Sequence, residues 1–124
     1  MFSTDVSQNE DRISELKKLI LENDIGVLSL NQFSELFKLE PKFIAEAPLV
    51  IKYLTLLISN NKHSEALGII STAFCVNPKL TENAFLIYKL AILNKASKLY
   101  FLSLQNLEAA KSLNPALNDD GSFV

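Results

Sequence analysis

Residues able to carry out chemistry are few and scattered in this chain. It has one His and one Cys, His63 and Cys75. His63 has no second His, Cys or carboxylate cluster near it to form a metal site, and one His with one Cys does not make up a set of nucleophile, base and orienting group. The three glycines, Gly26, Gly68 and Gly121, stand alone, so the sequence contains no glycine-rich phosphate loop. We therefore predict no metal site and no bound cofactor.

Carboxylates offer no better basis for catalysis. Glu22 and Glu46 are the only acids even remotely placed to act as a pair on the surface discussed below. Asp119 and Asp120 have the surroundings of a solvated tail and lack the pattern of a calcium loop. The sequence thus predicts that the protein is not an enzyme.

Charge and hydropathy exclude two further classes. Twelve basic and fourteen acidic residues give a formal charge of −2, and the basic residues are scattered, with Lys17 and Lys18 the only adjacent pair. Nucleic acid is therefore not an expected partner. No 18-residue window is apolar enough for a membrane span, and residues 1–12 do not resemble a secretory signal. With a single Cys, these features favour a soluble, cytoplasmic protein.

Elements that would position functional residues are predicted from composition and spacing. Only 3 Gly and 4 Pro occur in 124 residues, which favours an all-α fold over a β-sandwich. Three prolines, Pro41, Pro78 and Pro115, lie 37 residues apart, and the same shift superposes Leu30, Leu67 and Leu104. A period of this length across several positions predicts a three-fold helical repeat.

Each unit contains two amphipathic patterns separated by a polar break, and the proline is expected to stop the second helix. A single helical domain is expected over residues 10–117, with flexible tails at 1–9 and 118–124. The predicted helices are 10–22, 27–39, 43–60, 63–76, 80–95 and 97–113.

Small residues and prolines give these units a family resemblance. Ala91 lies where two helices of a pair would cross closely, Ala66, Ala73 and Ala110 lie in second helices, and the three prolines end the units. The pattern resembles degenerate tetratricopeptide repeats, in windows 10–43, 47–80 and 84–117. The resemblance implies a right-handed α-solenoid of three helix hairpins, six helices in all.

In such a stack, first-helix residues away from the packing stripe line a concave groove. The expected groove residues are Ser14, Lys18, Leu21, Ile51, Thr55, Ile58, Phe85, Tyr88, Ile92 and Lys95. Tetratricopeptide modules that bind acidic chaperone tails use basic and Asn side chains here, whereas this surface is mainly apolar. We therefore expect it to bind an amphipathic or apolar helical segment of another protein. The alternative is that these residues pack between units or under the N-terminal segment.

The expected role is a chaperone or adaptor, and small chaperones of type III secretion needle subunits share this size and class of fold. A second hypothesis concerns the last helix, whose residues Tyr100, Phe101 and Leu104 lack a covering helix in the sequence. They either join two copies as a structural scaffold or pack on their own first helix.

Overall fold

All regular structure in the described part of the chain is helical. The computed structural model describes the backbone of residues 2–115 and the side chains of residues 10–115. The α-helices are α1 (Phe2–Glu22), α2 (Leu30–Leu39), α3 (Ala47–Ser59), α4 (His63–Val76), α5 (Ala84–Ala96) and α6 (Tyr100–Leu113). Short 3₁₀ helices are η1 (Ile25–Val27), η2 (Pro41–Ala45) and η3 (Pro78–Glu82). The all-α class predicted from the sequence is thereby confirmed.

The 37-residue period recurs in the structure itself. Shifting the bounds of η2, α3 and α4 by 37 residues gives the bounds of η3, α5 and α6. The turns repeat as well, because Asn61 and Lys98 occupy the same position and both have a left-handed backbone, with φ of 59° and 66°. The second and third helix pairs therefore have the same local structure.

Prolines begin short helices as well as following long ones. The second helices end at Leu39 and Val76, as predicted, but Pro41 and Pro78 then open η2 and η3. Proline suits the first position of a helix because its φ is already helical and its missing N–H needs no partner. The helices α3 and α5 consequently begin at Ala47 and Ala84, four residues later than the sequence predicted.

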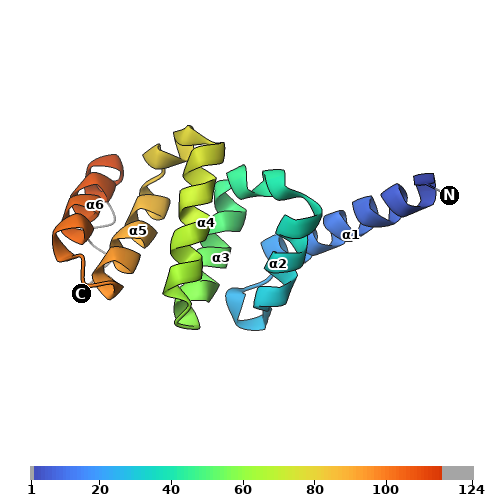
Figure 1. The fold of residues 1–124 in the computed structure, drawn as a ribbon, viewed down its shortest axis with the longest axis horizontal. Helices are drawn as coiled ribbons and strands as arrows, with labels where there is room; N and C mark the ends of the chain where they lie inside the picture. Colours follow the sequence, from blue (N-terminus) through green and yellow to red (C-terminus); the bar gives the residue numbers. More distant parts are fainter. Residues whose placement is uncertain (1, 116–124) are drawn as a thin grey trace.

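Helix α1 begins earlier than predicted. Its backbone is helical from Phe2, so residues 2–9, expected to be a flexible tail, form the first turns of the helix. No Gly or Pro occurs before Gly26, so nothing in the sequence stops the helix from extending backwards. The N-terminal half of α1 projects beyond the other helices (Figure 1). The expected C-terminal tail, 118–124, lies outside the described residues.

The first unit departs from the repeat at its turn. Helix α2 begins at Leu30, with a capping box between Ser29 and Gln32, whereas the period would place its start at Gly26. The 3₁₀ helix η1 takes the place of the missing first turn. This shorter second helix leaves a notch beside Leu30 and Leu56.

Helices pair in chain order, α1 with α2, α3 with α4 and α5 with α6, and each pair packs on the next (Figure 1). One apolar core runs through the first two pairs and reaches α5 through Leu86 and Leu93. A smaller cluster joins α5 to α6. The first helices α1, α3 and α5 are neighbours through the contacts of α3 with both of the others.

Polar and aromatic contacts fix α3 against the first pair. Tyr53 stacks on the rings of Phe33 and Phe37, with centroids 5.0 and 5.4 Å apart. The ammonium group of Lys52 donates hydrogen bonds to three backbone carbonyl oxygens at the end of α1, those of Ile20, Leu21 and Asn23, at 2.8, 3.2 and 2.8 Å. A lysine thus caps the C-terminus of α1 from the following unit.

Candidate partner-binding surfaces

The predicted groove residues come from equivalent positions on three neighbouring helices. Shifts of 37 residues relate Leu21 to Ile58, Thr55 to Ile92, and Pro48 to Phe85. Because α1, α3 and α5 pack in order, these positions form rows that cross the three helices. We call this set of first-helix residues the first-helix surface; its members are Ser14, Lys18, Leu21, Ile51, Thr55, Ile58, Phe85, Ile92 and Lys95.

Most of the first-helix surface is at least partly open to solvent. Lys18, Leu21 and Phe85 are exposed, and half of the Phe85 side chain is accessible, at 50%. Four more members, Ile51, Thr55, Ile58 and Ile92, are half-buried. The two isoleucines of α3 also pack against the main core, so they are held in place by their neighbours.

Tyr88 is the predicted groove residue that does not lie on an open surface. It is only 8% exposed and packs in the cluster that joins α5 to α6, with Ala110. Small side chains allow α6 to approach closely here, and the Ser103 hydroxyl donates a 2.7 Å hydrogen bond to the Ala91 carbonyl oxygen. Tyr88 therefore contributes to packing within the last helix pair, whereas the sequence analysis considered packing between units or under the N-terminal segment.

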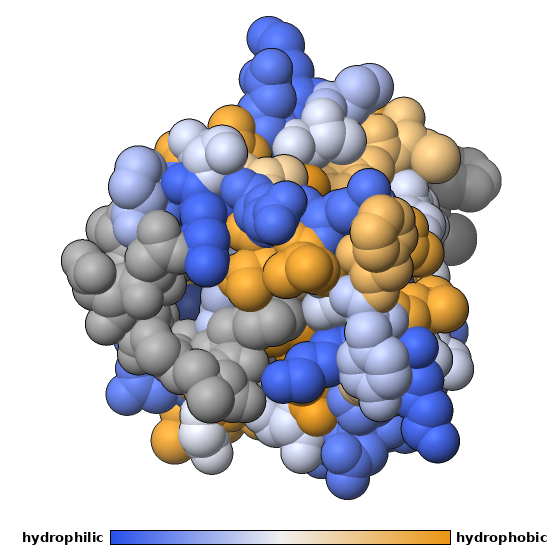
Figure 2. Space-filling model, turned by 90° about the vertical axis from the view of Figure 1, so that its left-hand side faces the viewer, coloured by the Kyte–Doolittle hydropathy of each residue, from blue (hydrophilic) through white to orange (hydrophobic). Residues whose placement is uncertain are grey.

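A second surface lies on the outer side of α6. Large exposed apolar side chains are concentrated at this end of the chain: Leu99, Tyr100, Phe101, Leu102, Leu104 and Leu113. Phe101 is the most exposed of them, at 73%. Figure 2 faces this end of the molecule and shows apolar side chains gathered across the middle and right of the face, with polar ones around them. The predicted oligomer residues Tyr100, Phe101 and Leu104 all belong to this set.

Repeat-equivalent residues show why α6 differs from α2 and α4. Leu30 and Leu67 are half-buried against the core, but Leu104 is 52% exposed. In the same way Phe33 and Ile70 are fully buried, whereas their equivalent, Leu107, is half-buried. The first two units hide this face under the next first helix, and no described helix follows α6.

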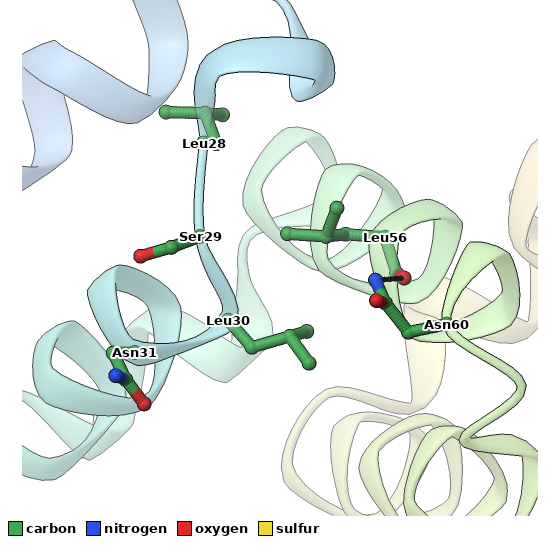
Figure 3. Close-up of a pocket in the computed structure, with 6 residues that line it drawn as sticks. All are labelled: Leu28, Ser29, Leu30, Asn31, Leu56 and Asn60. Atoms are coloured by element: carbon green, nitrogen blue, oxygen red, sulfur yellow. Dashed lines mark hydrogen bonds between the residues drawn. The ribbon is translucent and has the colours of Figure 1, made fainter.

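A notch between the first two pairs was not predicted from the sequence. It has a volume of about 370 Å³ and is lined by Leu28, Ser29, Leu30, Asn31, Leu56 and Asn60. Figure 3 shows Leu30 and Leu56 pointing toward each other across it, while Asn31 points away. The amide of Asn60 is engaged with its own helix, donating 2.8 Å to the Leu56 carbonyl oxygen. The long break at 23–29, compared with 60–62, was the sequence signal for this missing helical turn.

Several ionisable side chains have shifted pKa values, and each shift has a structural cause. Arg12 makes a two-pronged ion pair with Glu35, at 2.7 and 2.9 Å, and this hydrogen bonding lowers the pKa of the Glu35 carboxyl. Burial raises the pKa of the Tyr53 phenol and lowers the pKa of the Lys89 ammonium. None of these groups lies in a cluster suited to acid–base chemistry.

Candidate catalytic groups stay apart in the structure. His63 opens α4, and Cys75 is exposed near the end of the same helix. Among the described residues, no three His, Cys, Asp or Glu side chains lie together in a way that could hold a metal ion. In the same part of the chain, no helix is both long and apolar enough to cross a membrane.

Comparisons with known proteins give no family to which this arrangement can be assigned. No family model, curated protein or solved structure matches the chain.

Proposed function

We propose that the chain is a non-catalytic protein-interaction module, a chaperone or adaptor that binds an amphipathic or apolar helix of a partner protein. In this proposal the three helix pairs stack in the right-handed manner of tetratricopeptide repeats, and the first-helix surface forms the concave side. The observation that carries the proposal is the set of accessible apolar side chains on the neighbouring first helices: Leu21 and Ile58 at equivalent positions of α1 and α3, and Phe85 and Ile92 on α5.

The first-helix surface has physical properties that suit a helical ligand. An amphipathic helix places apolar anchors at positions i, i+3, i+4 and i+7, and a surface made of parallel rows can receive several of them together. Ile51 and Ile58 are packed against the core on one side, so their positions are set before any ligand arrives. Such preorganisation lowers the entropy cost of binding. Lys18 adds a positive charge beside the apolar row, which favours an acidic residue on the polar edge of the ligand.

The test uses helical peptides selected by display against the wild-type chain. Affinity is then measured by fluorescence anisotropy with Phe85→Asp and Leu21→Asp, two exposed positions where a charge should not disturb folding. We expect each variant to weaken binding at least about tenfold, because a carboxylate would be desolvated under the apolar face of the peptide.

Val76→Asp is the matched control. Val76 is 54% exposed but belongs to α4, which is a second helix. The Val76→Asp substitution should therefore leave the affinity for the peptide unchanged. Circular dichroism should give the same helicity for all three variants. Peptides that bind Phe85→Asp and Leu21→Asp as tightly as the wild type would rule out the first-helix surface as the site.

A further inference from the structure

One face of α6 is exposed at Tyr100 and Leu104 and half-buried at Leu107, which also packs against α5, and the spacing of its residues is symmetric. Four residues lie on one side of the helix with spacings of four, three and four: Tyr100, Leu104, Leu107 and Lys111. We call these four residues the α6 seam. One unit earlier, α4 packs on the following first helix, α5, and Phe74, the equivalent of Lys111, lies against Ile87 and Tyr88. A 4-3-4 spacing reads the same in both directions along a helix, so two such faces match when the helices run antiparallel.

A head-to-tail contact with a second copy does not fit the α6 seam. In the structure each second helix packs on the first helix of the next pair, and the equivalent positions Leu49 on α3 and Leu86 on α5 are both fully buried. Their equivalent on α1 is Arg12, which is already paired with Glu35. Stacking α1 of another copy on α6 would bury this charged pair against leucines, which is costly.

We propose that the α6 seam binds the α6 seam of a second copy of this chain, forming a two-fold symmetric dimer. The axis passes between Leu104 and Leu107, so each Leu104 packs on Leu107 of the partner subunit. The same symmetry brings the ring of Tyr100 to Lys111 of the partner subunit. An ammonium group can stack on a Tyr ring with favourable energy, and this chain already contains such a contact between Lys17 and Phe43, at 4.5 Å from the ring centroid.

Charge on α6 is compatible with self-association. The helix carries only Glu108 and Lys111, so its net charge is zero and two copies do not repel one another. Phe101 lies beside the α6 seam and is the most exposed large apolar residue of the described chain, so it would extend the contact at its rim. Symmetric dimers with a two-fold axis are the commonest form of soluble oligomer.

Analytical ultracentrifugation across a wide concentration range tests the dimer. The wild type should approach twice the mass of one chain, and Leu104→Asp should raise the dimer dissociation constant at least about tenfold. Leu102→Asp is the matched control, because Leu102 is 47% exposed on the same helix but points away from the α6 seam. Both variants should keep wild-type helicity.

The antiparallel orientation of the two α6 helices in the dimer is tested separately, by disulfide formation in a Cys75→Ser background. The double variant Tyr100→Cys with Lys111→Cys should cross-link into a covalent dimer, and Tyr100→Cys alone should not. A wild-type chain that stays monomeric at every concentration would overturn the proposal. So would equal weakening by Leu104→Asp and Leu102→Asp, or efficient cross-linking of Tyr100→Cys alone. These outcomes are independent of peptide binding at the first-helix surface.

Discussion

Lys52 and Lys89 occupy the same position of the repeat, yet they meet different surroundings. Lys52 caps the end of α1, where the chain passes into Asn23 without a left-handed residue. At the end of α3 the turn itself supplies the donors, since the backbone N–H of Lys62 bonds the Leu57 carbonyl oxygen at 2.9 Å. Lys89 is therefore left half-buried, with no hydrogen bond or ion pair to the described residues.

The same substitution should have opposite effects at these two positions. Lys52→Met removes the cap and leaves the carbonyl oxygens of α1 poorly satisfied, so we expect a loss of about 2 kcal/mol in the free energy of unfolding. Lys89→Met keeps the apolar stem and removes a partly desolvated charge, so we expect a gain of roughly 0.5 kcal/mol. Urea unfolding at pH 7 measures both. A loss of stability in Lys89→Met would contradict this account.

The gain in stability expected for Lys89→Met depends on pH, because burial lowers the pKa of the Lys89 ammonium group. Burial makes the folded chain release this proton at a lower pH than the unfolded chain does, so wild-type stability rises with pH across that interval. The advantage of Lys89→Met should therefore shrink as the pH rises toward the ordinary lysine pKa, about 10.4. Unfolding curves of both proteins at neutral and alkaline pH measure whether this difference in the free energy of unfolding becomes smaller.

At the scale of elements, helix ends were easier to predict than helix starts. The ends at Leu39, Val76 and Leu113 match the prediction because an Asn or Glu followed by Pro leaves little choice there. The starts of α3 and α5 were placed too early, because the apolar spacing of a 3₁₀ helix over five residues looks like the first turn of an α-helix.

The repeated turns offer a test at this same scale. Lys98 has a left-handed backbone, which is strained for a side chain with a Cβ atom and unstrained for glycine. We expect Lys98→Gly to stabilise the chain by about 1 kcal/mol, and Asn61→Gly to gain less because Asn tolerates this conformation. Lys98→Ala is the control, since it removes the charge but keeps Cβ. Equal effects of Gly and Ala in urea unfolding would contradict the explanation.

At the scale of the whole molecule, the period in the sequence predicted which helices come in pairs, but it did not predict which side chains the pairs bury. Burial of Tyr88 depends on how closely α6 approaches α5, and that distance is set by Ala91, Ser103 and Ala110 together. No single one of these residues signals it in the sequence. Tyr100, Phe101 and Leu104, the expected oligomer residues, are exposed in the structure, whereas Leu30 and Leu67, the equivalents of Leu104, are half-buried.

Chemical-shift mapping of a selected helical peptide on the isotope-labelled chain tests the central claim most directly. If the chain binds partner helices on its first-helix surface, the largest shift changes should fall on α1, α3 and α5, around Leu21, Ile58, Phe85 and Ile92. Changes confined to α2 and α4, on the side of Val76, would contradict the claim.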